Sequence, residues 1–313
     1  MNSPNASVVV LGTGGTIAGT ADNAADSLGY RAAQLGVMAL VATVPALAGQ
    51  ALEAEQVAQL DSKDIGPAVW QLLAQRVHAQ LARPEVAGVV VTHGTDTLEE
   101  TAYFLQRVLA PAKPVVLTAA MRPATALSAD GPQNLADAVT LAATSGASGV
   151  LVSLCGAVHA AVGVRKMHPY RTDAFGSGDV GALAHVEDGQ LRLHRPWPTG
   201  EPLGLTGLPA DPQRWPWVEI VTSHAGAGAR LVQALVARGV QGIVVAGSGN
   251  GKVHHALEAA LLQAQAAGVQ VLRSTRCLDG CVLPRPDDVL LDAGALTPVQ
   301  ARIELMLRLM PGA

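Results

Sequence analysis

Apolar runs that end in glycine-rich loops mark the first half of the chain. Residues 8–11 are four apolar residues, three of them β-branched, which predicts a buried strand. Gly12, Gly14 and Gly15 then break the pattern and predict a loop whose backbone approaches a ligand closely. Ligands bind at the carboxyl ends of strands in open α/β sheets, so Thr16 stands where a hydroxyl nucleophile would be useful.

A second strand and loop repeat this design. Residues 89–91 are three valines, and the loop after them carries Thr95 and Asp96 before a helical pattern at 98–105. Because the carboxyl ends of parallel strands meet at one edge of a sheet, the two loops are predicted to face each other.

Strands and helices continue to alternate after these loops. The pattern predicts strands at 113–118 and 149–154 and, between them, a helix that ends near Ala143. Such alternation is typical of a mostly parallel sheet flanked by helices. The predicted fold class is therefore α/β, with a larger N-terminal domain of this kind and a smaller C-terminal α/β domain.

Residues 191–213 are predicted to link the two domains, because this stretch is rich in proline and glycine and has little periodicity. The catalytic N-terminal domain is then expected at 1–190 and the C-terminal domain at 214–313. Within the C-terminal domain the pattern predicts a strand at 242–246 and helices at 256–266 and 301–309.

Composition excludes several classes of protein. Hydrophobic residues make up 49% of the 313 residues and charged residues 15%, so a large buried core is expected. The net charge of -4 and the lack of a long basic run argue against nucleic acid as a partner. No membrane association is predicted either, since no apolar run is long enough to cross a bilayer.

The cysteine count and the first residues bear on location. Three cysteines, an odd number, are typical of a reducing compartment rather than of a disulfide framework. Residues 1–7 hold no basic residue and lead directly into a strand, so they do not resemble a signal peptide. A cytoplasmic protein is expected, or a periplasmic one if a signal peptide has been removed.

The glycine-rich loops do not match nucleotide-binding motifs. Residues 12–17 place Ile17 at the last position of the dinucleotide fingerprint, which requires glycine or alanine. Residues 246–253 have alanine in place of the first glycine of a phosphate loop and valine in place of its magnesium-binding hydroxyl residue. No cofactor is therefore predicted.

Metal binding is not predicted from the histidines and cysteines. His254 and His255 are adjacent and so diverge on a helix. Cys277 and Cys281 lack a second ligand pair at the spacing of a zinc site. Side-chain hydroxyls remain as the candidates for catalysis.

The threonines of the two loops are these candidates, because a threonine hydroxyl becomes a nucleophile when a neighbour takes its proton. The sequence offers Lys166, Asp96 and Tyr30 as partners. Thr95, Lys166 and Asp96 would form a hydroxyl–amine–carboxylate relay comparable to Ser-His-Asp. The alternative is that Lys166 lies on the surface and that the two threonines bond only loop backbone.

Ser62 has two interpretations. It or Asp64 precedes a helix that starts near Pro67, where serine and aspartate are typical capping residues. The other interpretation is that Ser62 contacts a ligand. Both stay open on the sequence alone.

Five segments taken together resemble the bacterial-type L-asparaginases. They occur in the order of that family and extend from the first strand to the last helix. One glycine-rich loop would be weak evidence, but five ordered matches are specific. The segments are Thr13-Gly14-Gly15-Thr16-Ile17-Ala18, His93-Gly94-Thr95-Asp96-Thr97, Ala120-Met121-Arg122-Pro123, Ser128-Ala129-Asp130-Gly131-Pro132 and Leu296-Thr297-Pro298-Val299-Gln300-Ala301-Arg302.

The resemblance implies a two-domain hydrolase that acts on a side-chain amide without a cofactor. Thr16 would be the nucleophile, and Tyr30, on a mobile lid, would assist it. Thr95, Asp96 and Lys166 would form a second catalytic triad.

The resemblance also implies how the substrate is held. Ser62 and Asp96 would bind its α-carboxylate and α-ammonium, and the Ala120 carbonyl would face the leaving amide. Backbone N–H groups near Gly15 and Thr95 would stabilise the oxyanion.

Some positions depart from the family, which typically forms homotetramers built as dimers of dimers. Lys63 and Lys252 replace neutral residues, Lys63 at a position that touches the substrate ammonium. Asp287 and Asp288 lie where the match is poor and where the family brings an acid from a neighbouring subunit. A transfer-RNA-dependent amidotransferase subunit and a non-catalytic amino-acid-binding module remain alternatives.

Overall fold

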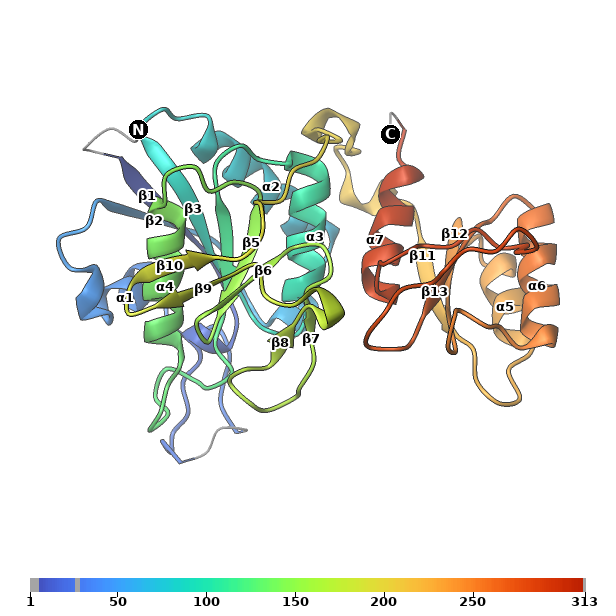
Figure 1. Cartoon of the computed structure of the whole chain (residues 1–313), viewed down its shortest axis with the longest axis horizontal. Coiled ribbons are helices and arrows are strands. Elements are labelled where there is room, and N and C mark those ends of the chain that lie inside the picture. The colour runs from blue at the N-terminus through green and yellow to red at the C-terminus, as the bar shows by residue number, and fades with distance from the viewer. Residues whose placement is uncertain (1–5, 26–28, 312–313) are drawn as a thin grey trace. The chain divides into compact units, whose positions relative to one another are not determined.

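The computed structural model of the chain describes residues 6–25 and 29–311, which fall into two compact units, Met1–Leu205 and Thr206–Ala313. Each unit is built on a sheet with helices packed on both of its faces (Figure 1). The predicted α/β class, with a larger N-terminal and a smaller C-terminal part, is confirmed.

The first unit contains an eight-stranded sheet in the order β10-β9-β6-β5-β4-β3-β1-β2. The five strands from β5 to β2 run parallel, whereas β6, β9 and β10 extend the sheet with antiparallel pairs. The strands are β1 (Ser7–Gly14), β2 (Leu52–Leu60), β3 (Val86–Thr92), β4 (Val115–Thr118), β5 (Val150–Leu154), β6 (Ala157–Ala160), β9 (Ala184–Glu187) and β10 (Gln190–Leu193).

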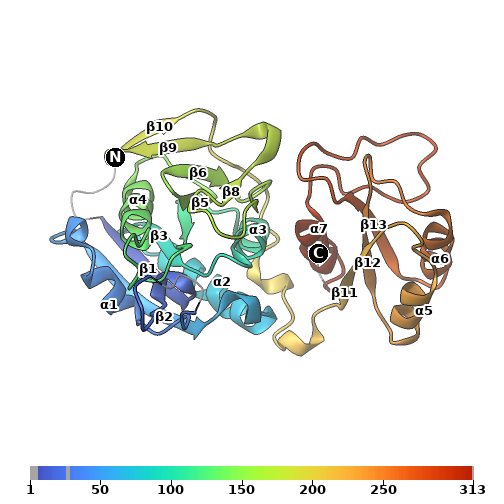
Figure 2. The same cartoon turned by 90° about the horizontal axis from the view of Figure 1, so that it is seen from below.

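Four helices cover this sheet and bury both of its faces (Figure 2). Val8 and Val10 of β1 pack with Leu135 in one apolar cluster, and the residues that alternate with them face the opposite side. On that opposite side Trp70 stacks on Phe104, with ring centroids 5.2 Å apart. The covering helices are α1 (Val37–Ala42) and α4 (Gly131–Ala143) on one face and α2 (Pro67–Leu81) and α3 (Leu98–Leu109) on the other.

The central strand β1 sets the position of the glycine-rich loop. It pairs in parallel with β3 on one side and β2 on the other, so that Gly12 lies opposite Thr92 and Gly14 opposite Leu60. The loops after β1, β2 and β3 therefore leave the same edge of the sheet side by side.

The segment before α2 corrects the capping hypothesis for Ser62 and Asp64. Helix α2 starts at Pro67 after Gly66, and no side chain caps it. Ser62 instead begins a 3₁₀ turn, Ser62–Asp64, whose cap is the Asp61 carboxylate. The capping interpretation was wrong because a separate short turn intervenes.

A hairpin of β9 and β10 was not predicted. Asp188 and Gly189 form its turn with φ values of 51° and 71°, as a two-residue hairpin turn requires. Residues 191–193 of the predicted linker belong to β10, and two 3₁₀ turns, Leu205–Gly207 and Pro212–Arg214, follow within or next to it. A separate two-stranded ribbon, β7 (Arg165–Lys166) and β8 (Phe175–Gly176), carries Lys166.

The second unit is a three-stranded parallel sheet in the order β11-β12-β13. Ile243 and Val245 face a core shared with α5 and α6, whereas Gly242 on the other face lies against Leu305 of α7. The elements are β11 (Val218–Thr222), β12 (Gly242–Gly247), β13 (Gln270–Thr275), α5 (Arg230–Ala237), α6 (His255–Ala266) and α7 (Pro298–Arg308).

Candidate active site

Three loops meet at the carboxyl edge of the first sheet. A Cβ atom on Gly15 would lie 2.3 Å from Gly94 Cα, and one on Gly94 would lie 2.5 Å from Ser62 Oγ. Gly15 also has a φ of +79°, which L residues rarely adopt. Glycine at these positions lets the backbones of the loops after β1 and β3 touch, with Ser62 against them.

Gly15→Ala should therefore disrupt the site. We expect the free energy of unfolding to fall by about 2–4 kcal/mol, because the positive φ and the overlap with Gly94 both oppose the methyl group. Gly49→Ala is the matched control, since Gly49 has a φ of +80° but open space around it; we expect a cost of about 1 kcal/mol there. Equal costs in urea titrations would show that the loop contact is unimportant.

Thr16 and Tyr30 form the first pair of functional groups. Thr16 is buried at 7% exposure, and its Oγ1 lies 2.6 Å from the Tyr30 hydroxyl. Backbone hydrogen bonds in both directions between Thr20 and Arg31, of 2.9–3.0 Å, bring Tyr30 back to this position. Tyr30 was expected on a mobile lid, and residues 26–28, shortly before it, lie outside the described residues.

Lys166, Thr95 and Asp96 form the second group. Lys166 Nζ donates to Thr95 Oγ1 at 2.8 Å and to Asp96 Oδ1 at 2.7 Å. The Lys166 side chain is 21% exposed, so Lys166 is not a free surface lysine. The two-residue strand β7 thus places the Lys166 amine against the loop of Asp96, which lies 70 residues earlier in the chain.

Ser62 lies under this second loop. It is buried at 1% exposure, its Oγ accepts the Asp96 backbone N–H at 3.2 Å, and its carbonyl accepts the Thr97 hydroxyl at 2.7 Å. The neighbouring Lys63 is exposed and pairs with Asp64, whose carboxylate raises the pKa of Lys63. Ser62 therefore orders the Asp96 loop, and Lys63 stands in solvent at the same turn.

A buried hydrogen-bond chain supports Gly94, and sequence reasoning missed it. Trp70 Nε1 donates to Thr101 Oγ1 at 2.9 Å, and Thr101 Oγ1 lies 2.9 Å from His93 Nε2. Because indole only donates, the Thr101 proton goes to Nε2, and His93 Nδ1–H donates to the Gly94 carbonyl at 2.7 Å. Burial lowers the pKa of His93 to about 4, so the ring is neutral at pH 7. His93 therefore positions this loop through its hydrogen bonds, and as a neutral ring it is not a general acid at neutral pH.

The loop after β4 is held by Asp130 and Asn134. Asp130 accepts the backbone N–H groups of Met121 and Arg122 at 2.9 and 3.0 Å, and Asn134 Nδ2 donates to the Ala119 carbonyl at 2.9 Å. Ala120, between these anchors, is fully buried. Ala120 thus lies between two anchored neighbours in the loop that follows β4, the strand next to β3.

A cavity of about 410 Å³ opens next to the Lys166 relay. Its volume suits a small-molecule ligand. It is lined by Asp96, Lys166, Met167, His168 and Pro169.

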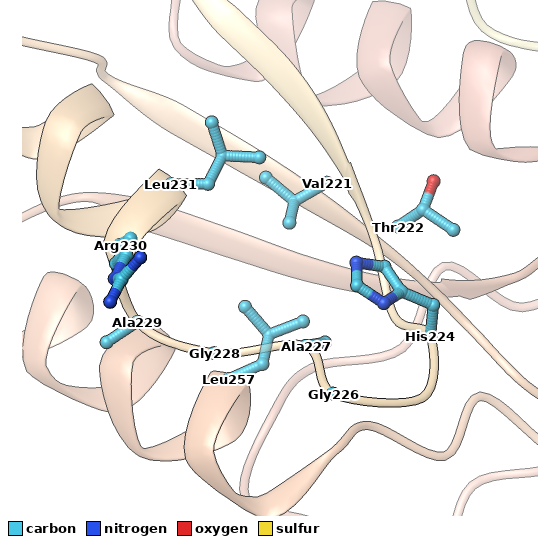
Figure 3. Close-up of a pocket in the computed structure, with 10 residues that line it drawn as sticks. All are labelled: Val221, Thr222, His224, Gly226, Ala227, Gly228, Ala229, Arg230, Leu231 and Leu257. Carbon is cyan, nitrogen blue, oxygen red and sulfur yellow. The ribbon is translucent and has the colours of Figure 1, made fainter.

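A hollow of about 480 Å³ lies in the second unit, between the carboxyl end of β11 and the start of α5 (Figure 3). His224 and Arg230 stand on opposite sides of it, and most of its lining is small or apolar. His224 Nδ1 is 2.8 Å from the Ala225 carbonyl. The described residues that line it include no threonine–lysine pair of the kind found around Lys166.

The candidate acids Asp287 and Asp288, and Lys252, which departs from the family, lie in the second unit. Asp288 accepts the backbone N–H of Arg285 and pairs with buried Arg273, and these contacts lower the pKa of its carboxyl. Asp287 is exposed and lies 3.1 Å from Arg285. Lys252 is exposed, and its backbone pairs with Ser248. Asp288 therefore bonds Arg285 in its own loop and Arg273 of β13, whereas the Asp287 side chain faces solvent.

Over the described residues, 6–25 and 29–311, no three histidine, cysteine or acidic side chains are arranged to hold a metal ion. None of the helices in these ranges has the length and apolar character needed to cross a membrane. The functional groups that the structure brings together in the candidate site are side-chain hydroxyls, the Lys166 amine and the Asp96 carboxylate.

Comparisons with known proteins agree with this picture. Two family models match in succession, "Asparaginase, N-terminal" over residues 7–199 and "Glutaminase/Asparaginase C-terminal domain" over residues 217–312. L-asparaginase 2 of Bacillus subtilis (strain 168) is 39% identical over 309 residues, which span 96% of this chain and 81% of that protein. Glutaminase-asparaginase of Pseudomonas fluorescens biotype A is 38% identical over 316 residues, spanning 97% and 86%.

A solved structure is also similar. The crystal structure of "Probable Cytoplasmic L-asparaginase" from Campylobacter jejuni superimposes with a TM-score of 0.91 at 38% sequence identity. The match covers 97% of this chain and 95% of that chain. The similarity to this protein, in sequence and in fold, therefore extends along nearly the full length of the chain.

Proposed function

Because this chain belongs to the asparaginase family, we propose that it hydrolyses L-asparagine to L-aspartate and ammonia with Thr16 as the nucleophile. The observation that carries this proposal is the meeting of two hydroxyl centres at one sheet edge. Thr16 and Thr95 lie in the loops that follow the adjacent parallel strands β1 and β3, and these loops touch at Gly15. Thr16 is paired there with Tyr30, and Thr95 with Lys166.

The first half of the reaction transfers the acyl group to the enzyme. Thr16 Oγ1 bonds to the side-chain carbonyl carbon of asparagine while its proton passes, with help from the Tyr30 hydroxyl, to the leaving nitrogen. The carbon–nitrogen bond then breaks and ammonia departs. Backbone N–H groups near Gly15 and Thr95 would stabilise the negative oxygen formed in between.

The second half returns the enzyme to its starting state. Water adds to the ester carbon, and the neutral amine of Lys166 takes its proton through Thr95, with Asp96 stabilising the resulting ammonium. The ester bond breaks, Thr16 recovers a proton, and aspartate leaves. The sum is asparagine plus water giving aspartate plus ammonia.

Substrate recognition is proposed to use the neighbouring groups. Ser62 and Asp96 would bind the α-carboxylate and α-ammonium, and Lys63, next to Ser62 in the chain, is proposed as a further substrate contact. The carbonyl of buried Ala120 would accept from the leaving amide. This assignment gives the relay residue Asp96 a second role, in substrate binding.

The assembly and location are also proposals. A homo-oligomer, a dimer of dimers, would place an acid of the loop 284–288 in a neighbouring copy's site; exposed Asp287 suits this better than Asp288, which pairs with Arg273. A cytoplasmic location agrees with three free cysteines, all exposed in the structure, and with the name of the Campylobacter jejuni relative.

Ammonia release from free asparagine, measured without transfer RNA, tests the proposed function. The reaction requires only substrate and water, so purified protein should turn over many times. An amidotransferase subunit would instead require transfer RNA, and a binding module would give binding in calorimetry without any ammonia. Either result would refute the proposal.

Asparagine should be a better substrate than glutamine. With the α end fixed by Ser62 and Asp96, one extra methylene displaces the carbonyl from Thr16, and such a change is worth about 10- to 200-fold. The ratio of kcat/KM values for the two amides measures this preference. Equal values, as the name of the Pseudomonas fluorescens relative leaves open, would contradict it.

A further inference from the structure

Glu99 lies beside the candidate site but has no part in the relay described above. It is the second residue of α3, and its Oε2 accepts the backbone N–H of Lys166. Burial raises the pKa of this carboxyl to about 7, against the opposing effect of the Lys166 N–H. An acid that ionises near neutrality thus touches the backbone of the candidate base.

The position of Lys166 depends on few contacts. Strand β7 is only two residues long, and Lys166 pairs with Phe175 of β8 on one side. The Glu99 hydrogen bond ties the other side of β7 to the start of α3. Helix α3 begins directly after the loop that carries Thr95 and Asp96, the two partners of the Lys166 amine. The same helix end therefore contacts the Lys166 backbone and adjoins both partners of its side chain.

The charge of Glu99 decides how firmly it holds this strand. An ionised carboxylate is a stronger acceptor for an N–H group than a neutral carboxyl. The charged groups that act on Glu99 are Glu100 on α3, which opposes its ionisation, and Arg165 and Lys166 on β7, which favour it. Asp96 in turn pairs with Lys166.

We propose that Glu99 is a positioning residue for Lys166: its ionised carboxylate holds the Lys166 backbone N–H and so keeps the amine within reach of Thr95, and turnover rises as Glu99 loses its proton. This inference rests on the proposed hydrolysis of asparagine. Glu99 touches no reacting atom and acts through the placement of the amine.

The pH profile of Glu99→Gln is the main test. In the wild-type protein, kcat/KM should rise severalfold between pH 6 and pH 8, because a carboxyl of pKa about 7 ionises over that range. The glutamine amide still accepts the Lys166 N–H but does not titrate, so the ratio of wild-type to Glu99→Gln kcat/KM should grow severalfold from pH 6 to pH 8, and any rise carried by another group should remain in both proteins. At pH 8, kcat of Glu99→Gln should be severalfold lower than that of wild type, with little change in KM. The matched control is Glu100→Gln, which removes the neighbouring charge but not the acceptor and should keep the rise.

Thermal stability provides a readout that needs no activity. A pKa raised by folding means that the folded state binds more protons than the unfolded state between about pH 4.5 and pH 7, so stability falls as pH rises through this window. The Tm of Glu99→Gln relative to wild type should therefore increase from pH 5 to pH 8. The corresponding difference for Glu100→Gln should not increase in this way.

The outcomes separate this inference from the proposed function. If the wild-type protein hydrolyses asparagine and Glu99→Gln keeps the wild-type pH profile, the inference is wrong while the function stands. If the wild-type protein releases no ammonia, the function is wrong, and a Tm difference that does not change with pH would overturn the ionisation of Glu99 as well. If Glu99→Gln does not fold, Glu99→Asp replaces it: a shorter carboxylate should lower kcat and keep the rise, and an unchanged kcat would overturn the inference.

Discussion

Thr16→Val is expected to lower ammonia release from asparagine by roughly four orders of magnitude or more, as the loss of the nucleophile does in covalent hydrolases. Valine has nearly the shape of threonine, so the buried loop should keep its conformation. The lost hydrogen bond to Tyr30 should cost only about 1 kcal/mol of unfolding free energy, because Tyr30 is partly exposed and can bond water. Steady-state kinetics and urea titration measure the two effects.

Thr13→Val is the matched control for this substitution. Thr13 lies on the same loop, is buried at 1% exposure, and donates its hydroxyl to the Thr92 carbonyl at 2.9 Å. Its loss should cost stability, by about 1 kcal/mol, without removing a reacting group. If both variants kept activity within a few-fold of wild type, Thr16 would not be the nucleophile; if both lost it equally, the loop shape and not the Thr16 hydroxyl would be responsible.

The parallel part of the fold was predictable because its signal is local. The valine runs at 8–10 and 89–91 and the apolar strand ending at Leu154 are buried on both faces, so they read as continuous apolar segments. The predicted end of α4 at Ala143 is also the observed one. These elements form the rigid edge from which the loops emerge.

The antiparallel extension was missed because its strands are short and mixed in polarity. Strand β10 has four residues, most of them exposed, and lies at the end of the sheet. The Asp188-Gly189 pair is nonetheless a strong hairpin signal, and it could have shown that the predicted linker, 191–213, begins inside a strand.

The candidate residues of the proposed site could be chosen from the sequence, but the residues that support them could not. Thr16, Thr95 and Lys166 are chemically distinctive at loop positions, and the structure brings Thr95 and Lys166 together. His93 and Glu99 gave no such signal, because a buried imidazole and an acid in the first turn of a helix both have ordinary structural explanations. Only the contacts between distant segments, such as Glu99 with Lys166, distinguish these cases.

Lys166→Met is expected to lower kcat by about 10²- to 10⁴-fold, the usual contribution of a positioned base. Methionine is unbranched like lysine and only one atom shorter, so it fills most of the same partly buried space, but it neither accepts a proton nor bonds Thr95. Asp96 loses its partner, yet its side chain is 53% exposed, so water can solvate it and the fold should persist. The loss should therefore appear in kinetics rather than in unfolding.

The shape of the pH profile separates a base from a structural lysine. A positioned base makes the rate depend on pH, so any alkaline rise of the wild-type rate that Lys166 carries should be missing in Lys166→Met. Lys113→Met is the matched control: Lys113 Nζ donates to the Arg83 carbonyl at 2.7 Å in the same unit, away from the relay, and its replacement should change neither the rate nor the profile. A Lys166→Met protein that is slower but keeps the alkaline rise would assign Lys166 to the structure of the loop, and the proton would have to pass to another group near Thr95.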